Sequence, residues 1–119
     1  ELQVLARLLS MKGNEQRLLC DLSRRFNLKL IALTKGAGGS LLYSQERIYV
    51  HDGYKTEVVD TVGSGDTFTA ALALGMLTGS DLRTINDYAN RVASFVCSKR
   101  GATPPLPEDL RITRWLNGG

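Results

Sequence analysis

The sequence is short of cysteine, histidine and long apolar runs, and each shortage argues against a class of protein. Its two cysteines, Cys20 and Cys97, sit inside apolar patterns rather than in a spaced framework. We therefore expect small buried thiols in a reducing compartment rather than disulfides. The one histidine, His51, has no cysteine or carboxylate at ligand spacing and is not predicted to bind a metal. The longest apolar run, residues 69–77, has about half the ~18 residues of a membrane span.

The chain also lacks a strong charge of either sign and a recognisable export signal. Its formal net charge is +3, with lysine and arginine spread along the sequence. This positive charge is too small and too evenly spread to predict nucleic-acid binding, although it suits the binding of an anionic small molecule. The sequence opens at Glu1, without an initiator methionine, a basic segment or a signal-type apolar core. We expect a cytoplasmic protein that binds neither nucleic acid nor membrane.

What remains is an ordinary globular composition with one excess, which is glycine. The 119 residues are 43% hydrophobic and 23% charged, enough for one domain with a real core and too few for two ordinary domains. Of the 12 glycines, five fall in two short segments, residues 34–39 and 61–66. These two segments decide the functional prediction.

The first third of the chain predicts two helices and a strand. Leucines recur at helical spacing over residues 2–11, and Asn14 can cap a second helix whose apolar face runs to Phe26. Residues 30–34 are nearly all apolar and are followed by glycines. This pattern is typical of a strand that is buried on both faces of a parallel sheet.

A hairpin, a further strand and three helices are expected next. Residues 40–44 and 47–51 are β-prone runs two residues apart, which predicts an antiparallel hairpin. Residues 57–60 predict a short strand that leads into the second glycine segment. Helices are predicted from Thr67 to Thr78, from Ser80 or Asp81 towards Gly101, and from Leu106 to Trp115. This order of elements indicates an α/β fold with helices packed against a mostly parallel sheet, and ligands usually bind where the strands of such a sheet end.

The second glycine segment carries the strongest functional signal. Gly63 and Gly65 have no Cβ, so the backbone there can approach a ligand closely. The N–H groups of residues 63–66 would lie at a helix N-terminus, which attracts an anion such as a transferring phosphoryl group. Asp66 would repel that anion, so its presence suggests a second role, accepting a proton from an attacking hydroxyl. The alternative is that Asp60 or Asp66 only caps the helix.

The first glycine segment opens at a predicted strand end. Residues 34–39 could wrap the phosphates and sugar of a nucleotide, or they could form only a tight loop into the hairpin. Neither segment is a Walker P-loop, because no G-x-x-x-x-G-K-[ST] pattern occurs and Lys35-Gly36 has the reverse order.

Together these residues resemble a known family. Residues 60–68, D-T-V-G-S-G-D-T-F, closely match the D-T-x-G-A-G-D-x-F signature of the ribokinase-like, or PfkB-type, carbohydrate kinases. Residues 34–39 fit the T-x-G-x-x-G nucleotide loop of that family. Ala89-Asn90, followed by Gly101-Ala102 and a proline-containing tail, keeps the family order. The V-G-S-G-D form and residues 49–59 are most similar to fructokinase-type members.

The resemblance implies a fold and an incomplete chain. The fold would be a three-layer α/β/α ribokinase-like (Rossmann-like) sheet, with the β-hairpin near the nucleotide loop. Family members are well over twice as long, so residues 1–119 would be a single partial domain, the C-terminal portion. The absent half would supply most sugar contacts.

The resemblance also implies roles for particular residues. Asp66 matches the catalytic base, and Gly63, Ser64 and Gly65 match the anion hole for the phosphoryl group, with Ser64 in place of the usual alanine. Asn90 matches a residue close to the adenine. The nucleotide loop is matched by Thr34, Gly36 and Gly39.

Metal ligands are implied in the same way. Family members that use a monovalent cation such as K⁺ hold it with hard oxygen ligands. Glu1 matches, by its spacing to Thr34, the last residue of an N-x-x-E motif that helps to organise Mg²⁺. The cation ligands are matched by Asp60 and the carbonyls of Val62, Val96, Lys99 and Gly101.

We therefore expect an ATP- and Mg²⁺-dependent phosphotransferase acting on a hydroxymethyl group of a small fructose-like or ribose-like sugar. Two alternatives stay open. One is a nucleoside kinase of the same family, and the other is an isolated nucleotide-binding or structural fragment that is inactive without a sugar site. An absent half would also uncover a strand edge and apolar surface, which predicts self-association.

Overall fold

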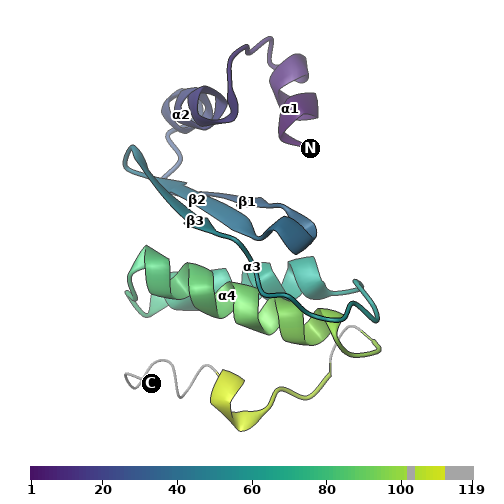
Figure 1. The fold of residues 1–119 in the computed structure, drawn as a ribbon. Helices are drawn as coiled ribbons and strands as arrows, with labels where there is room; N and C mark the ends of the chain where they lie inside the picture. The colour runs from purple at the N-terminus through teal and green to yellow at the C-terminus, as the bar shows by residue number, and fades with distance from the viewer. Residues whose placement is uncertain (102–103, 112–119) are drawn as a thin grey trace.

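The chain forms three layers, with helices on both sides of a sheet (Figure 1). The structure is a computed structural model and describes residues 1–101 and 104–111. One helical layer holds α1 (Leu2–Leu8) and α2 (Glu15–Phe26), and the other holds α3 (Ser64–Leu77) and α4 (Leu82–Cys97). The predicted α/β/α layering is therefore confirmed.

The sheet between these layers has three strands in the order β1-β2-β3, and both pairings are antiparallel. The prediction of a mostly parallel sheet is wrong for the described residues. Only the short loop 35–39 joins the first two strands, whereas a parallel neighbour needs a crossover of about a dozen residues or more. The strands are β1 (Ile31–Thr34), β2 (Ser40–Ser44) and β3 (Arg47–His51), so the predicted hairpin is confirmed.

The central strand, β2, is the strand that is buried on both faces. Its alternation turns Leu41 and Tyr43 towards Leu19 of α2, and it turns Ser40 towards Asn86 of α4. The sequence assigned this double burial to residues 30–34. However, β1 alternates between half-buried and exposed positions because it is the edge strand of the described sheet.

Helix α2 begins and ends where its sequence predicts. The side chain of Asn14 accepts a hydrogen bond from the Arg17 N–H at 2.9 Å, and Asn27 ends the helix in a left-handed conformation. The apolar face is shorter than predicted, because Phe26 remains 50% exposed. The last turn extends past the surface that the rest of the helix covers, and the Arg25 guanidinium lies 5.5 Å from the Phe26 ring centre.

Helices α3 and α4 pack closely against each other below the sheet. Phe68 and Ala71 of α3 meet Tyr88, Ala89 and Val92 of α4 in one buried cluster. Helix α3 begins at Ser64, earlier than the predicted Thr67, because Thr67 N–H already bonds to the Gly63 carbonyl at 2.9 Å. Asp81 caps α4 through the N–H groups of Arg83 and Thr84, as predicted.

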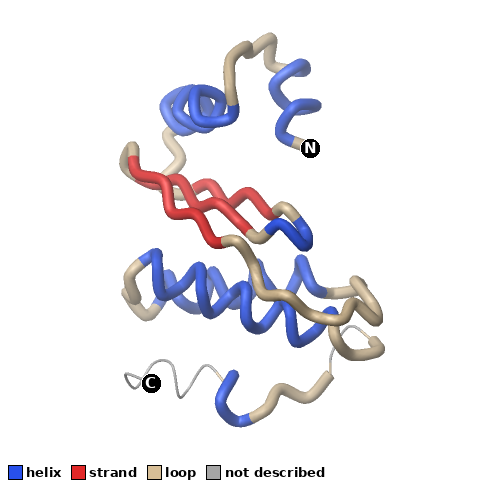
Figure 2. The backbone as a smooth tube through the Cα atoms, viewed as in Figure 1, coloured by secondary structure: helices blue, strands red, loops and turns tan. Residues whose placement is uncertain are grey.

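Two predicted elements are absent or shorter. Residues 57–60 form no strand; the N–H groups of Val59 and Asp60 both donate to the carbonyl of Cys97, at 2.8 and 3.1 Å. Figure 2 shows the loop after β3 running along the helical layer instead of joining the sheet. Of the helix predicted over 106–115, the described residues contain only the 3₁₀ turn η2 (Glu108–Leu110), and Trp115 lies outside them. Within residues 1–101 and 104–111, no helix is long and apolar enough to cross a membrane.

Candidate functional site

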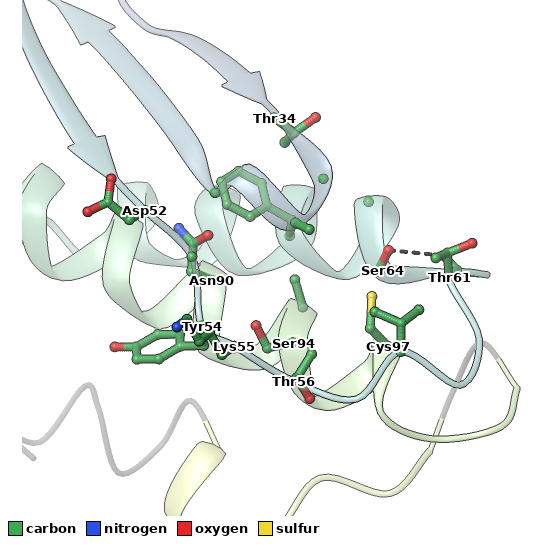
Figure 3. Close-up of a pocket in the computed structure, with 18 residues that line it drawn as sticks. Thr34, Asp52, Tyr54, Lys55, Thr56, Thr61, Ser64, Asn90, Ser94 and Cys97 are labelled. Carbon is green, nitrogen blue, oxygen red and sulfur yellow. Dashed lines mark hydrogen bonds between the residues drawn. The ribbon is translucent and has the colours of Figure 1, made fainter.

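A pocket of about 680 Å³ opens where the sheet meets α3 and α4 (Figure 3). This volume lies in the range of small-molecule sites, about 300–1,000 Å³. Both glycine segments reach the pocket, although they are far apart in the sequence. The predicted site residues that line it are Thr34, Gly36, Gly39, Ser64, Gly65 and Asn90.

One end of the pocket is the N-terminus of α3. Gly63 precedes the helix with φ of 82°, a left-handed conformation that favours glycine. Ser64 is held by two hydrogen bonds to the Thr61 carbonyl, from its N–H at 3.3 Å and from its hydroxyl at 2.9 Å. No acceptor among the described residues takes the N–H groups of Gly65 and Asp66. These free donors, together with the helix dipole, suit an anion.

Asp66 lies in the first turn of α3 with its side chain exposed, and it is not one of the residues that line the pocket. No side chain caps α3, so the alternative that Asp60 or Asp66 serves only as its cap is wrong. Asp66 therefore stands beside the pocket, next to Gly65, with its carboxylate open to solvent or to a ligand.

Asp60 fastens the start of this turn to the chain after α4. Its two carboxylate oxygens accept the N–H groups of Val62, at 2.9 Å, and Gly101, at 3.2 Å. These two hydrogen bonds, with a smaller effect of the Arg100 charge, lower the pKa of Asp60 below its ordinary value. Three of the five implied cation ligands therefore lie together. The Val96 carbonyl accepts the Lys99 N–H at 3.2 Å.

The nucleotide loop predicted around Gly39 rests directly on the chain that follows β3. A Cβ at Gly39, where φ is +90°, would lie 1.9 Å from the His51 carbonyl oxygen and 2.5 Å from the Asp52 carbonyl carbon. Only glycine allows this approach of two backbones. Lys35 of the same loop does not line the pocket, because its ammonium pairs with Glu15 at 2.9 Å.

The sequence analysis missed one whole wall of the pocket, formed by residues 52–58, which we call the strap. Figure 3 shows Tyr54, Lys55 and Thr56 of the strap in front of α4. The resemblance over residues 49–59 gave this segment no role in the site, because its place depends on contacts with distant residues. The strap residues that line the pocket are Asp52, Gly53, Tyr54, Lys55, Thr56 and Val58.

A cluster around Asp87 anchors the strap to α4. The Gly53 N–H donates to His51 Nδ1 at 2.9 Å, so the other ring nitrogen donates to Asp87, also at 2.9 Å. The Tyr54 hydroxyl donates to the same carboxylate, which Arg91 contacts at 3.1 Å. Burial, then the bond to Asp87, raises the pKa of Tyr54. Burial alone would raise the pKa of Asp87, but its hydrogen bonds to Tyr54, His51 and Arg91 together lower it.

Helix α4 contributes more to the pocket than the single predicted Asn90. Ala93, Ser94 and Cys97 also line it, three, four and seven positions further on. Residues at this spacing lie on one face of a helix, so the sequence could have predicted all three as lining residues once Asn90 was placed in the pocket. Cys20 and Cys97 are both free and half-buried, and thus less buried than predicted.

The structure gathers no group of three or more metal-ligating side chains among the described residues. Glu1 lies at the start of α1, outside the pocket lining. His51 is half-buried and has the structural role described above.

Sequence comparisons connect the pocket to a family. The model of the pfkB family of carbohydrate kinases matches residues 5–109. Fructokinase from Escherichia coli is 29% identical over 107 residues, which cover 85% of this chain and 35% of that protein. A nucleoside kinase from Methanothermobacter thermautotrophicus is 34% identical over 79 residues, 66% of this chain and 25% of that protein. The chain thus spans about a quarter to a third of the length of these curated relatives.

Solved structures show the same fold. Ribokinase from Thermotoga maritima matches with a TM-score of 0.79 at 18% identity, over 100% of this chain and 40% of that one. A ribokinase II from E. coli, in complex with ATP and Mg²⁺, matches with a TM-score of 0.71 at 24% identity, over 76% of this chain and 29% of that one. The chain therefore has a ribokinase-like fold in part.

The contact between Gly39 and the strap predicts a strong effect of one methyl group. We expect Gly39→Ala to lower the free energy of unfolding by about 3 kcal/mol or more, because steric overlap with the His51 carbonyl adds to backbone strain. Gly36→Ala is the matched control: its φ is also positive, at +56°, but no atom lies within 4 Å of the added Cβ, so strain alone should cost about 1–2 kcal/mol. Urea denaturation of both variants measures the difference, and equal losses would contradict the contact.

The hydrogen bonds of Asp60 predict a pH dependence. Because the folded-state pKa is lowered below the reference value of 3.8, the stabilisation is complete above that value and is lost as the pH falls through the folded-state pKa. We expect wild type to have a higher Tm than Asp60→Asn by a constant amount between about pH 5 and 7, and the difference to narrow below about pH 4. Circular dichroism melts at each pH test this, and a difference that stays constant down to about pH 2 would refute it.

Proposed function

The chain belongs to the pfkB family of carbohydrate kinases, and on that premise we propose that it is the C-terminal, nucleotide-binding and catalytic portion of an ATP-dependent sugar kinase. One observation carries the proposal. Both glycine segments and Asn90 line a single pocket, and that pocket ends at the free N–H groups of α3. A nucleotide can place its phosphates at those donors and its base towards α4.

The residues at the phosphate end suggest how the reaction proceeds. Asp66, at the open edge of the turn, would take the proton of the substrate hydroxymethyl group as its oxygen forms a bond to the γ-phosphorus. The bond to the β-phosphate oxygen breaks, and ADP leaves. The N–H groups of Gly63 and Gly65, together with the α3 dipole, would stabilise the charge on the transferring group. The Ser64 N–H would join them by leaving the Thr61 carbonyl, to which it donates at 3.3 Å. The substrate would be a small fructose-like or ribose-like sugar.

Cations complete the proposal. Mg²⁺ prefers phosphate oxygens and water to a dedicated protein cage, and the pocket offers no carboxylate cluster, so the nucleotide would supply most of its ligands. The carboxylate of Asp60 and the backbone carbonyls matched to the cation site are hard oxygen ligands that suit K⁺. Asp60 bonds to the N–H groups of Val62 and Gly101, so an ion held there would lie beside the turn before α3 and would offset phosphate charge. Glu1, which the resemblance matches to the organisation of Mg²⁺, lies outside the pocket lining.

Two other functions have specific support. The relative named a nucleoside kinase favours a nucleoside hydroxymethyl group as the acceptor. The chain covers only 35% of the length of fructokinase, which favours a nucleotide-binding module that lacks a sugar site of its own. Such a module would be inactive alone, because catalysis needs both reactants held in line.

Replacing the proposed base separates binding from chemistry. We expect Asp66→Asn to lower the rate of phosphate transfer from ATP about 10²–10⁴-fold while ATP affinity is kept. Asp21→Asn is the matched control and should behave as wild type, because Asp21 is a half-buried carboxylate of α2 that pairs with Arg17 and does not line the pocket. An enzyme-coupled assay of ADP release measures the rate of phosphate transfer, and calorimetry measures the affinity for ATP. Full activity of Asp66→Asn would exclude Asp66 as the base, and ATP binding without turnover in wild type would support the module.

Uncovered apolar surface supports the self-association proposed for this chain. Leu77 of α3 is 84% exposed and Leu8 of α1 is 78% exposed, and the outer edge of β1 has no partner among the described strands. We expect light scattering to give a mass above the 13.0 kDa of one chain, rising with concentration. Leu77→Ser should lower that mass, and a monomer at every concentration would contradict the proposal.

A further inference from the structure

We propose that His51 is a proton-sensitive latch for the strap: its neutral ring holds the strap against the pocket, and its protonation loosens the strap and weakens ligand binding. The part of this inference that concerns ligand binding rests on the nucleotide site proposed above. His51 is the only histidine in the sequence. Histidine is the side chain whose charge ordinarily changes between about pH 5 and 8, so the latch responds within that range.

The strap is a pocket wall with few hydrogen bonds of its own. No backbone N–H or carbonyl of residues 53–58 bonds to another backbone group in the part of the chain that the structure describes. Nevertheless, all but one of the strap residues line the pocket. The ties that hold this wall are side-chain bonds, from Gly53 to His51 and from Tyr54 to Asp87. A segment with so few bonds opens easily when one of them is lost.

The bond between Gly53 and His51 fixes the position of the proton on the imidazole ring. A backbone N–H can only donate, so Nδ1 of His51, 2.9 Å from the Gly53 nitrogen, must be an unprotonated acceptor. The single ring proton is on Nε2, which donates to the Asp87 carboxylate at 2.9 Å. A second proton has to go to Nδ1. Two N–H groups would then face each other, and the bond to Gly53 is lost.

Gly53 is the point where the strap meets the first glycine segment. A Cβ added at Gly53 would lie 3.1 Å from the Cα and the nitrogen of Gly39, and 3.3 Å from the Ala37 carbonyl oxygen. Gly39 and Ala37 both line the pocket. Loss of the His51 bond at this contact therefore loosens two walls of the pocket together, the strap and the loop 35–39.

The charged groups beside the His51 ring keep their charge while the ring titrates. Asp87 of α4 bonds to the ring, Arg91 contacts the same carboxylate at 3.1 Å, and the Tyr54 ring centre lies 5.0 Å away. Burial would raise the pKa of Asp87, but its three side-chain hydrogen bonds lower it, so the carboxylate stays ionised. Burial, and then the bond to Asp87, raises the pKa of Tyr54, so the phenol stays neutral.

The other neighbours of His51 add no acceptor for the strap. Its partner in β2 is Ser40, and Gly39 lies against its carbonyl; neither residue titrates. Asp52, the next residue in the chain, is exposed. A second ring proton is attracted by Asp87 and opposed by the charge of Arg91, but neither group restores a bond to Gly53.

Protonation of the ring acts on the strap alone. The His51 side chain is 20% exposed, so protons from water reach it without unfolding of the chain. When the ring is charged, its bond to Asp87 becomes a charge-assisted pair and is kept. Only the bond to Gly53 breaks, so the strap loosens while β3 and α4 stay joined.

Nuclear magnetic resonance tests the latch without any ligand. Because the sequence has one histidine, its ring nitrogens are assigned directly in a long-range ¹H–¹⁵N spectrum. At about pH 8 we expect the proton on Nε2 and a scalar coupling between Nδ1 and the Gly53 nitrogen across their hydrogen bond, and we expect this coupling to vanish at about pH 5.5. A proton on Nδ1 at about pH 8, or a coupling that persists when the ring is charged, would overturn the latch.

Calorimetry with ATP tests the effect on the pocket. We expect wild type to bind ATP about five-fold or more weaker at about pH 5.5 than at about pH 8, relative to His51→Asn at each pH. The asparagine oxygen can replace Nδ1 as the acceptor but takes up no proton, so the two proteins should bind equally at the higher pH. Comparing them cancels the titration of the nucleotide phosphates. A ratio of affinities that stays constant over this range would refute the latch.

Two further variants separate the acceptor from the general charge of the cluster. His51→Leu, which has no acceptor, should bind ATP weakly at both pH values, and tight binding at both would contradict the role of the ring. Arg91→Gln removes a charge but leaves Nδ1 and Gly53 in place, so the loss of affinity at low pH should persist. A pH response that disappears in Arg91→Gln would assign it to charge and overturn the latch. If ATP does not bind to wild type at any pH, the proposed nucleotide site fails, and the coupling between His51 and Gly53 still decides the latch.

Discussion

The seating of α4 against the sheet depends on a buried hydrogen-bond network of three polar side chains, Ser40, Asn86 and Asn90. Buried amides and hydroxyls are costly unless each finds a partner, so only one register of the helix against β2 satisfies all three. That register carries Asn90, Ser94 and Cys97 to the pocket on one helical face. The fold and the pocket thus share a constraint, since the bonds that join the helix to the strand also turn the amide nitrogen of Asn90 towards the protein interior.

Close contacts between backbone segments shape the rest of the site. Gly39 lies against the chain at His51 and Asp52, where a side chain would overlap with backbone atoms, and this contact holds the first loop against the strap. At the far end, the left-handed turn at Gly63 starts α3 and leaves donors free. Neither feature needs a charged side chain. N–H groups and a helix dipole can attract an anion without the desolvation of a buried cation.

Local signals in the sequence predicted the elements whose structure is decided locally. The hairpin over residues 40–51 follows from two β-prone runs around a two-residue turn, and Asn14 and Asp81 cap helices through their own side chains. The errors share one cause. Residues 30–34, residues 57–60 and Phe26 were assigned from their apolar character, but burial and strand pairing depend on which distant segment covers them.

The sequence by itself determined which groups meet at the site: two glycine segments and the amide of Asn90 in the pocket, and the carboxylate of Asp66 beside it, in the order found in the pfkB family. The sequence is enough to identify such motifs, because the backbone freedom of a glycine and the chemistry of a side chain are properties of the single residue. Only the tertiary structure decided that the strap closes the pocket, through Gly53, Tyr54 and the Asp87 cluster, and that the nitrogen of Asn90 turns inward. Those outcomes depend on hydrogen bonds between residues far apart in the chain, and no local pattern specifies which partner a buried polar group will find.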